Sequence, residues 1–573
     1  MEKLQQIYTH PIHADMREMI KYSANKFSSK DAFIIKHKEK KTVTYEKVSY
    51  TRFYEEINAL GSALLKRGFA DKRIAIVGKN SYPWALSYFA TTCGIGICVP
   101  LDKGLPFDEA ESSIVRSKAD VIIFDKEHGD MIKQIRENHK SNLSLYICME
   151  PYEDFLTLDQ LLLEGKEALA DGYVDYYQRP IDPDALAIIL FTSGTTSMSK
   201  AVMLSHRNIV SNAYWAVATE PIYSTDVNMA FLPYHHTFGS TGQVVMLYAG
   251  VTTTYCDGLK YLQKNLVEYH VSIFVCVPLL IESIYKKILV SVEKQGKTKL
   301  VSTMRKVSNA LLKVGIDMRR VFFKSILEQL GGDIRFIISG ASGIDPEALK
   351  GFNDFGILTV QGYGLTETAP ILTAESAKNM RAGSVGKPMP PVDVKIVDPN
   401  EDGIGEVVGR GPSIMAGYYE NPEETEKVLK DGWFHTGDLG FIDKDGFLFL
   451  RGRKKNVIVL KNGKNVYPEE LELLISNLPY VEENMVFGMP KHDDENDFTL
   501  SLKLVYKPEF FKERDPEITP EIIKDIIEKD VDKINDELPH YKQLRRIIVT
   551  DEPMIKTTTG KVKRFEEIKT FQK

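Results

Sequence analysis

The feature of this sequence that most constrains its fold is an alternation between short β-branched segments and longer amphipathic segments. The strand-like segments are RIAIVG (73–78), DVIIFD (120–125), LAIILFTSG (186–194), VSIFVCVP (271–278) and IRFIISG (334–340). Between them lie stretches with helical spacing of apolar residues, such as 52–68 and the region around Leu262 and Leu266. Strands separated by helices predict an α/β architecture built on parallel or mixed sheets.

The pattern changes after about Pro391, where short strands alternate with glycine-containing turns. The segments DPNEDGIGEVVGRG (398–411) and IDKDGFLFLRGR (442–453) are typical of antiparallel hairpins. They predict a β-rich subdomain at the end of the larger part of the chain.

A smaller α+β region begins at about Lys455. Its first helix is expected after Pro468, because Glu469 and Glu470 would then lie in the first turn, where the helix dipole favours them. A chain of 573 residues is too long for one ordinary core. We therefore expect a large domain over residues 1–454 and a small, mobile C-terminal domain over residues 455–573.

The segment 285–332 differs from its surroundings because it is helical, basic and amphipathic. One interpretation is a solvated helical insertion in the large domain. The other is a surface that approaches anionic lipid, where apolar and basic side chains act together. The residues alone leave both open.

The segment from Asn80 to Leu101 contains no charged residue, so a membrane span has to be considered. Prolines and glycines interrupt it, however, whereas a span needs about 20 continuous apolar residues. We interpret it as a buried helix from Trp84 to about Thr92, followed by a short buried strand from Ile95 to Val99.

Charge and cysteine usage narrow the class of protein. The net charge of −6 argues against a general nucleic-acid binder, which needs a positive field. The five cysteines form no CxxC pair, which predicts a reduced, cytoplasmic protein rather than a disulfide scaffold or a zinc module. Peripheral contact with a membrane and the oligomeric state stay open.

The first segment with chemical potential is FTSGTTSMSK (191–200), which follows an apolar strand. Its backbone N–H groups and hydroxyls can bind a polyphosphate, with Lys200 as a point charge. It is not a Walker A loop, because no second glycine precedes Lys200 and Ala201 follows it. The alternative is an ordinary Ser/Thr-rich turn.

Two further loops carry carboxylates. In QGYGLTET (361–368), Tyr363 could stack on a flat ring, Thr366 could donate to a phosphate and Glu367 could bind Mg²⁺. In DGWFHTGD (431–438), Asp438 could accept hydrogen bonds from two ribose hydroxyls. Solvated turn residues are the alternative in both loops.

Two lysine-rich segments lie in the C-terminal part. They are RGRKKNVIVLKNGKNVYPEE (451–470), at the expected domain boundary, and TTTGK (557–561). A lysine on a Thr/Gly loop can reach into a site built by another domain. The second segment also fails the Walker A pattern, since Val562 follows the lysine. A plain basic surface is the alternative for each.

Taken together and in this order, the motifs resemble those of the adenylate-forming superfamily, which contains acyl-CoA synthetases, firefly luciferase and peptide-synthetase adenylation domains. The resemblance extends from about Thr44 to Arg564, and its closest branch is that of bacterial long-chain fatty acyl-CoA synthetases. It also includes LPYHHTFG (232–239), SGASG (339–343) and GSVGKP (383–388). It implies a ligase that uses ATP, Mg²⁺ and coenzyme A.

The resemblance implies that four residues line the loop around the β- and γ-phosphates: Ser193, Thr195, Thr196 and Lys200. This loop departs from the pattern TSGTTGxPKG of the family. The chain has Ser197, Ser199 and Ala201 where Gly, Pro and Gly are expected. Two lost glycines restrict the backbone, so we expect ATP handling to be retained but slowed.

The resemblance also implies the contacts of the nucleoside. Adenine would be bordered by Gly340, Ala341 and Ser342, and Tyr363 would stack on it. Asp438 would bind the ribose with the assistance of Arg453.

The remaining roles implied by the resemblance concern the reaction itself. Thr366 would contact the α-phosphate, Glu367 the Mg²⁺ ion, and His236 the acyl and adenylate groups, while His235 would be structural. Lys561 would be the catalytic lysine of the first step and Lys455 the hinge residue. The loop containing Gly463 and Lys464 would face the thioester site.

The expected reaction is ATP-dependent conversion of a fatty acid to acyl-AMP with release of pyrophosphate, followed by transfer to coenzyme A. Long-chain acids are preferred because the insertion at 285–332 resembles that branch; medium-chain or aromatic acids are alternatives. A carrier-protein phosphopantetheine could replace coenzyme A, since the basic regions 542–546 and 561–564 fit either thiol. A non-enzymatic sensor of ATP or acyl groups is supported only by the altered phosphate loop.

Overall fold

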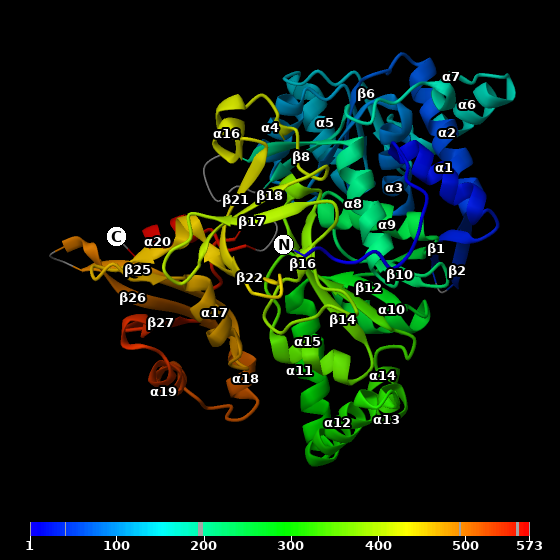
Figure 1. Ribbon diagram of the computed structural model, residues 1–573. Coiled ribbons are helices and arrows are strands. Elements are labelled where there is room, and N and C mark those ends of the chain that lie inside the picture. Colours follow the sequence, from blue (N-terminus) through cyan, green and yellow to red (C-terminus); the bar gives the residue numbers. More distant parts are fainter. Residues whose placement is uncertain (1, 41, 193–198, 492–493, 557–560, 572–573) are drawn as a thin grey trace.

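The computed structural model in Figure 1 describes residues 2–40, 42–192, 199–491, 494–556 and 561–571. It consists of a large domain with several sheets and helices, followed by a smaller α+β domain. The fold class predicted from the sequence is therefore confirmed.

The first sheet of the large domain has the order β19-β9-β8-β4-β3-β5-β6-β7. Neighbouring strands from β8 to β7 are parallel, whereas β8, β9 and β19 pair antiparallel. The strands predicted at 73–78, 120–125 and 186–194 are confirmed as members of this sheet. Its strands are β3 (Arg73–Val77), β4 (Ile97–Leu101), β5 (Val121–Phe124), β6 (Leu145–Cys148), β7 (Leu156–Thr157), β8 (Leu186–Thr192), β9 (Lys200–Ser205) and β19 (Gly417–Tyr418).

The second sheet has the order β16-β15-β14-β13-β12-β10-β11-β1-β2. It is parallel in its centre and antiparallel at both ends. The two remaining strand predictions, at 271–278 and 334–340, are confirmed here. Its strands are β1 (Asp31–Glu39), β2 (Thr42–Ser49), β10 (Val227–Ala230), β11 (Thr252–Tyr255), β12 (Ile273–Cys276), β13 (Phe336–Ser339), β14 (Leu358–Gly364), β15 (Ile371–Ala374) and β16 (Lys387–Pro388).

One hydrophobic core joins these two sheets through the helices packed on them. It includes Ile74 and Ile188 from the first sheet, Ile273 and Phe336 from the second, and the fully buried Trp84 from a helix. The helices of this part are α1 (Met16–Lys26), α2 (Tyr50–Lys66), α3 (Tyr82–Ala90), α4 (Phe107–Ser117), α5 (Gly129–Asn138), α6 (Leu158–Ala170), α7 (Asp175–Gln178), α8 (His206–Thr219), α9 (Thr237–Ala249) and α10 (Leu262–Glu268).

The uncharged segment from Asn80 to Leu101 folds into a buried helix and a buried strand, as predicted, although the strand begins at Ile97 and not at Ile95. Helix α3 passes into a π-helical turn (Thr91–Ile95) at the positive φ of Gly94, and β4 follows. The side chains of Trp84, Phe89 and Cys93 are almost fully buried in the protein. Among the described residues, no helix has both the length and the hydrophobicity needed to span a bilayer.

The hairpins predicted after Pro391 are confirmed as an antiparallel third sheet. It contains β17 (Asp393–Val397), β18 (Gly405–Arg410), β20 (Leu429–Lys430), β21 (Trp433–Ile442) and β22 (Leu448–Arg453), with α16 (Pro422–Val428) beside it.

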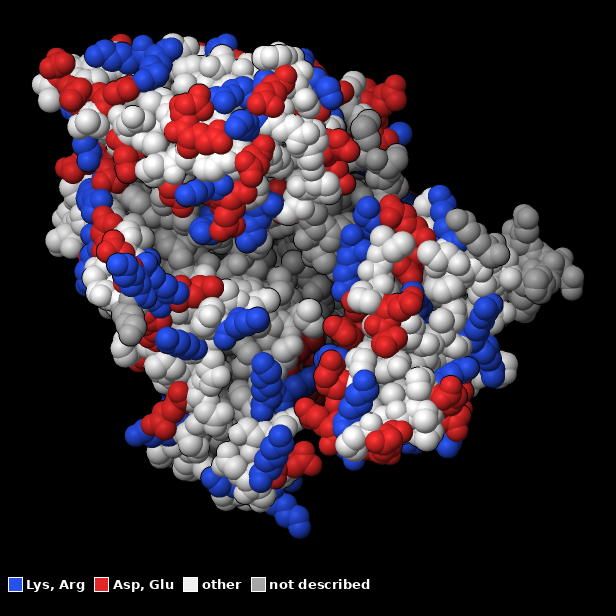
Figure 2. Space-filling view, turned by 180° about the vertical axis from the view of Figure 1, so that it is seen from behind, with Lys and Arg blue, Asp and Glu red and all other residues white. Residues whose placement is uncertain are grey.

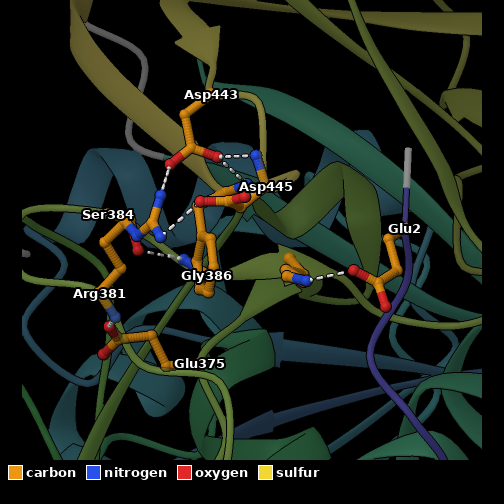
Figure 3. Close-up of polar contacts among 9 residues, drawn as sticks. Glu2, Glu375, Arg381, Ser384, Gly386, Asp443 and Asp445 are labelled. Atoms are coloured by element: carbon orange, nitrogen blue, oxygen red, sulfur yellow. Dashed lines mark hydrogen bonds and ion pairs between the residues drawn. The ribbon is translucent and has the colours of Figure 1, made fainter.

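The turn between β21 and β22, which carries Asp443 and Asp445, lies near Glu2 of the N-terminal segment (Figure 3). Arg381 donates to Asp445 in the turn between β21 and β22 at 2.7 Å, and Lys387 donates to Glu2 at 2.6 Å. Next to them the carboxyl group of Glu375 is 1% exposed and accepts from the backbone N–H of Arg381. This junction therefore holds a buried carboxyl group close to surface ion pairs.

The segment 285–332 is helical, as predicted. Its helices are α11 (Pro278–Lys294), α12 (Thr298–Lys313), α13 (Arg319–Phe322) and α14 (Lys324–Glu328), which pack with α15 (Pro346–Asp354). A second core, which includes Tyr285, Phe323 and Phe355, holds them against the second sheet.

The C-terminal part has a core of its own around Leu471, Leu502 and Ile527. Helix α17 (Pro468–Ser476) has Glu469 and Glu470 in its first turn, as predicted, and it packs against β22 of the large domain. The other elements are β23 (Ile458–Val459), β24 (Asn465–Val466), β25 (Val481–Lys491), β26 (Asp494–Tyr506), α18 (Pro508–Lys512), α19 (Pro520–Glu537), β27 (Arg546–Thr550) and α20 (Arg564–Lys569).

Candidate active site

Several of the predicted site residues that the structure describes lie where the sheets of the large domain meet the small domain. Gly340 follows β13, Tyr363 lies at the end of β14, and His236 is the N-cap residue of α9. Asp438 lies in β21, opposite Arg453 of β22. Loops at the carboxyl ends of parallel strands commonly form ligand sites in α/β proteins.

Asp438 is held by Arg453, which was predicted to assist it, and by Tyr363, which was predicted to stack on adenine. The hydroxyl of Tyr363 donates to Oδ2 at 2.7 Å, and Nε of Arg453 lies 2.7 Å from Oδ1. The carboxyl group is 6% exposed. Burial raises the pKa of Asp438, whereas Arg453, Tyr363 and Lys561 act in the opposite direction. The structure therefore brings these residues together, with the Tyr363 hydroxyl used to orient the carboxylate.

Glu367 is oriented by a residue that the sequence did not reveal. The hydroxyl of Tyr418 donates to Oε1 of Glu367 at 2.9 Å. Glu367 belongs to a 3₁₀ turn (Thr366–Thr368), and its carbonyl accepts from the N–H of Met415 at 2.9 Å. Tyr418 follows Gly417, as Tyr363 follows Gly362. This pattern alone does not assign Tyr418 to the site, because its position depends on the pairing of β19 with β9.

Lys200 approaches the same tyrosine from the first sheet. Its Nζ lies 4.9 Å from the centre of the Tyr418 ring and 2.6 Å from Oε2 of Glu424. Hydrogen bonds from Lys200 and Lys427 lower the pKa of Glu424 to about 2. Glu424 is thus a second residue of this region that the sequence analysis did not identify. Nothing in its local sequence distinguishes it from its acidic neighbours.

Most of the predicted phosphate loop lies outside the described residues. This applies to Ser193, Thr195, Thr196 and the substituted Ser197. On the carboxyl side, Arg116 donates to the hydroxyl of Ser199 at 3.2 Å and to its carbonyl at 2.8 Å. Ala201 is buried in β9, opposite Phe191. The end of the loop is therefore fixed to helix α4 and to the neighbouring strand.

The loop of Gly340, Ala341 and Ser342 lies against the start of α9. A Cβ atom on Gly340 would come within 3.1 Å of the Phe238 ring and 3.5 Å of the Gly362 carbonyl. Ala341 has a φ of +76°, so the chain turns sharply after β13. The segments that contain Gly340, Phe238 and Gly362, all predicted to border the nucleotide or the acyl group, are thus in close contact.

The two adjacent histidines share a buried environment. Their rings are 4.4 Å apart, and Nε2 of His235 lies 3.5 Å from Oδ1 of Asp102. Burial and the neighbouring His236 lower the pKa of His235 to about 3. Burial also lowers the pKa of His236. Both rings are therefore neutral at neutral pH, and neither brings a positive charge to the site.

A small apolar cavity of about 20 Å³ lies between β10 and α9. Phe231, Leu232, Phe238 and Met246 contribute to its wall. Gly242 also lines it, and a Cβ at this position would meet no atom within 4 Å. Because α9 begins directly after His236, the cavity lies beside the histidine pair.

Lys561 reaches the site from the small domain. The side chain of Lys561 is exposed, but the surrounding protein displaces enough solvent to lower its pKa. The charge of Arg453 lowers this pKa further, whereas Asp438 and Glu367 raise it. In turn, Lys561 lowers the pKa of His236. Residues 557–560, which complete its motif, lie outside the described part. The charge of Lys561 thus lowers the pKa of two groups of the large domain, Asp438 and His236.

The predicted hinge and thioester residues lie at the start of the small domain. Lys455 belongs to the 3₁₀ turn Lys454–Asn456 after β22, and burial, followed by Arg453 and Lys200, lowers its pKa. Gly463 forms the turn between β23 and β24 with a φ of +77°. Lys464 lies over the Tyr541 ring at 4.3 Å, within the small domain. Their roles stay predictions.

The carboxylate of Glu367 fits a Mg²⁺ ion, which prefers oxygen ligands. Within the described ranges no three His, Cys, Asp or Glu side chains come together as a metal cage. Mg²⁺ is typically bound by one or two carboxylates together with substrate phosphates. A single oriented carboxylate agrees with that mode of binding.

Comparison with known proteins gives consistent matches over most of the chain. A family model described as AMP-binding enzyme matches residues 20–419, and one described as AMP-binding enzyme C-terminal domain matches residues 455–573. Long-chain-fatty-acid–CoA ligase 5 of Rattus norvegicus is 29% identical over 92% of this chain and 83% of its own length. Long-chain-fatty-acid–CoA ligase 1 of Cavia porcellus is 30% identical over 78% of this chain and 68% of its own length.

Solved structures resemble the whole chain in fold. An anthranilate CoA ligase in complex with anthranoyl-AMP has a TM-score of 0.76 at 20% identity, covering 98% of both chains. A fatty acyl CoA synthetase of Mycobacterium tuberculosis has a TM-score of 0.64 at 21% identity, covering 97% of this chain and 98% of its own.

Proposed function

The chain belongs to the AMP-binding enzyme family, and from this premise we propose that it is an ATP-dependent, AMP-forming ligase that joins long-chain fatty acids to coenzyme A. The observation that carries the proposal is the position of Lys561 at the domain boundary, where Asp438 and Glu367 oppose the lowering of its pKa by burial. The match to long-chain-fatty-acid–CoA ligases in two mammals supports the choice of substrate class.

In the first step, a carboxylate oxygen of the fatty acid attacks the α-phosphorus of ATP. The bond between the α-phosphorus and the bridging oxygen breaks, and pyrophosphate leaves. Both reactants are anions, so the step needs positive charge at the α-phosphate. We assign this role to Lys561, with Thr366 as a hydroxyl donor; a contact of this kind lowers the barrier by about 3 kcal/mol.

The large domain would orient the nucleotide for this attack. Asp438, fixed by Tyr363 and Arg453, would accept hydrogen bonds from the ribose hydroxyls. Lys200 would leave Glu424 and turn to the β- and γ-phosphates. Mg²⁺, when held by Glu367, would supply charge neutralisation of the phosphate oxygens.

In the second step, the thiol sulfur attacks the acyl carbonyl carbon. The bond to the phosphate oxygen breaks, AMP leaves, and the thiol proton is released. The protein supplies no covalent nucleophile, because the acyl group travels on AMP. For this step the small domain would rotate about Lys455, which withdraws Lys561 and brings the loop of Gly463 and Lys464 to the site.

The cavity between β10 and α9 is the proposed entrance for the acyl chain. Its volume of about 20 Å³ is little more than one water molecule needs. A long acyl chain therefore has to displace side chains from the wall, and Met246 is suited to this because its unbranched thioether repacks readily. This proposal makes the cavity wall a determinant of chain length.

Coenzyme A is favoured over a carrier protein as the acceptor. In the basic regions considered for carrier docking, Lys542 pairs with Glu470 at 2.8 Å and Arg564 pairs with Glu472. These charges are used within the small domain, so the surface they could offer a carrier is reduced. The contacts that orient Asp438 and Glu367 likewise favour an enzyme over a non-catalytic sensor.

We further propose a cytoplasmic enzyme that makes peripheral contact with membranes. All five cysteines are free, which suits a reducing compartment.

A panel of carboxylic acids of graded length, from octanoate to stearate, tests the proposal. Pyrophosphate release is measured with ATP and Mg²⁺, in the presence and absence of coenzyme A. The proposal predicts release that is greatest with long-chain acids, and acyl-CoA formation when the thiol is added. Absence of release across the whole panel would favour the sensor, and thioester formation on a carrier protein but not on coenzyme A would favour the other acceptor.

A further inference from the structure

The helical insertion carries a strong local charge in an acidic protein. Between Pro278 and Glu328 there are eleven Lys and Arg residues against four Asp and Glu residues, a local net charge of +7 in a chain of net charge −6. Figure 2 shows basic side chains with uncharged ones between them at the lower end of the large domain, where α12 and α13 lie in Figure 1.

Helix α12 has a well-defined inner face. Val301 and Met304 pack against the second core, and Ser308 is fully buried. Arg305 donates to Asp354 of α15 at 2.6 Å. These contacts fix the rotation of the helix, so the residues on its outer face are held toward solvent.

The outer face of α12 and its C-terminal end carry two parallel stripes. Lysines recur at intervals of seven residues, and each is followed by an aliphatic residue. Because seven residues are close to two helical turns, residues with this spacing lie on one side of a helix. The basic stripe consists of Lys299, Lys306 and Lys313, and the aliphatic stripe of Leu300, Val307 and Val314, which are 55%, 46% and 71% exposed.

The same composition continues onto neighbouring elements. At the end of α11, Leu289 and Val290 are 40% and 47% exposed, close to Lys287 and Lys294. After α12, Ile316 is 51% exposed. We use the name insertion surface for the two stripes together with these five residues.

The fold itself does not account for the lysines of the insertion surface. None of Lys287, Lys294, Lys299, Lys306 and Lys313 forms an ion pair with any described residue. The aliphatic side chains beside them leave 40–71% of their surface exposed to water. Unpaired cations next to exposed apolar groups indicate a partner that is both anionic and apolar.

We propose that the insertion surface docks the enzyme on lipid bilayers with anionic headgroups. Its lysines would contact lipid phosphates, while Leu300, Val307 and Val314 would enter the boundary between headgroups and acyl chains. Protein interfaces are enriched in Tyr, Trp, Phe and Arg and depleted in Lys, so this Lys- and Val-rich surface fits a protein partner less well. Nucleic acid would explain the lysines but not the aliphatic stripe.

The choice of a lipid partner rests in part on the proposed function. A long-chain fatty acid partitions into bilayers, since each buried methylene contributes about 0.8 kcal/mol, so an enzyme docked there meets its substrate at a raised local concentration. The insertion also touches the small domain, because Lys286 donates to the carbonyl of Ser476 at 3.2 Å. Docking would thus take place next to the domain that moves during the reaction.

Co-sedimentation of the full-length protein with vesicles tests this inference. One set of vesicles is phosphatidylcholine alone, and the other contains about one third phosphatidylglycerol. One variant replaces Lys299, Lys306 and Lys313 by Gln, and another replaces Leu300, Val307 and Val314 by Ser. The control replaces three exposed lysines elsewhere, Lys66, Lys166 and Lys430, by Gln and has the same net charge as the lysine variant.

We expect the wild type and the control to bind the anionic vesicles at least tenfold more strongly than the neutral ones. The lysine variant should lose binding by on the order of 100-fold, and the serine variant by about tenfold. Failure of the wild type to sediment with anionic vesicles would overturn the inference. That result is expected if the insertion surface binds an acidic protein instead of lipid. Equal losses in the lysine variant and the control would overturn it too.

Pyrophosphate release with dissolved octanoate, measured on the same preparations, separates this inference from the proposed function. All variants should retain this activity, because none of the substituted residues belongs to the active site. Normal release without vesicle binding would refute the docking surface alone. Vesicle binding without release for any acid would refute the ligase function alone.

Discussion

The hydroxyl of Tyr418 donates a hydrogen bond of 2.9 Å to Oε1 of Glu367, the carboxylate proposed to bind Mg²⁺. Lys200, the proposed phosphate ligand, lies over the same aromatic ring at 4.9 Å. Tyr418 therefore links the two groups that would handle the phosphates, although they come from different sheets.

Replacement of Tyr418 by Phe keeps the ring beneath Lys200 and removes only the hydrogen bond to Glu367. A hydrogen bond to a charged group contributes about 1.5–3 kcal/mol, so pyrophosphate release should fall roughly tenfold or more. The concentration of Mg²⁺ needed for half-maximal rate should rise. Tyr419→Phe is the matched control, and an unchanged Mg²⁺ dependence in Tyr418→Phe would remove Tyr418 from the site.

Under the proposed mechanism, Glu424 competes with ATP for Lys200. Because the ion pair of 2.6 Å must open before Lys200 can contact a phosphate, Glu424→Gln should lower the KM for ATP. The pair is partly exposed, so the change should not exceed about fivefold. The measurement is the KM for ATP from steady-state kinetics, with the neighbouring Glu423→Gln variant as control. A raised KM would mean that Glu424 positions Lys200 instead.

Gly242 offers a direct test of the acyl cavity, because a side chain at this position would enter open space. Gly242→Leu should fill the cavity and shift the preference toward shorter acids, with the largest loss for stearate. Gly242→Ala is the control for folding, since alanine favours the helix by about 1 kcal/mol. An acid-length profile identical in Gly242→Leu and the wild type would place the acyl chain elsewhere.

The buried carboxyl of Glu375 predicts a specific pH dependence of stability. Burial raises its pKa from 4.5 to about 7. Between these values the folded state holds a proton that the unfolded state has released, so the free energy of unfolding decreases as pH rises through this range. Above about pH 7 the loss levels off at about 3 kcal/mol.

Glu375→Gln should abolish this component. Denaturant unfolding at pH 4.5, 6 and 8 should show a difference in unfolding free energy, variant minus wild type, that grows with pH. A difference that is constant across the three pH values would contradict a raised pKa for Glu375.

The sequence predicted the elements of the fold well where the pattern was local. The β-branched segments became β3, β5, β8, β12 and β13 because their apolar faces are buried against helices. The uncharged segment ending at Leu101 was also interpreted correctly, since its prolines and glycines interrupt a continuous span.

The candidate site was only partly predictable. Asp438, Glu367 and Lys561 stand in motifs with distinctive neighbours, and the structure brings them into one region. Tyr418 could not be assigned a role in this way, because its position depends on the pairing of β19 with β9, where it lies opposite Val202. Contacts of this kind come from tertiary register, which no local pattern specifies.

The central claim is that Lys561 serves the first half-reaction only, and the variant Lys561→Ala tests it most directly. The measurement compares acyl-adenylate formation from fatty acid and ATP with thioester formation from supplied acyl adenylate and coenzyme A, with Lys563→Ala as control. We predict that adenylate formation falls by about two to three orders of magnitude, while thioester formation persists at close to the wild-type rate. An equal loss in both half-reactions would contradict the account.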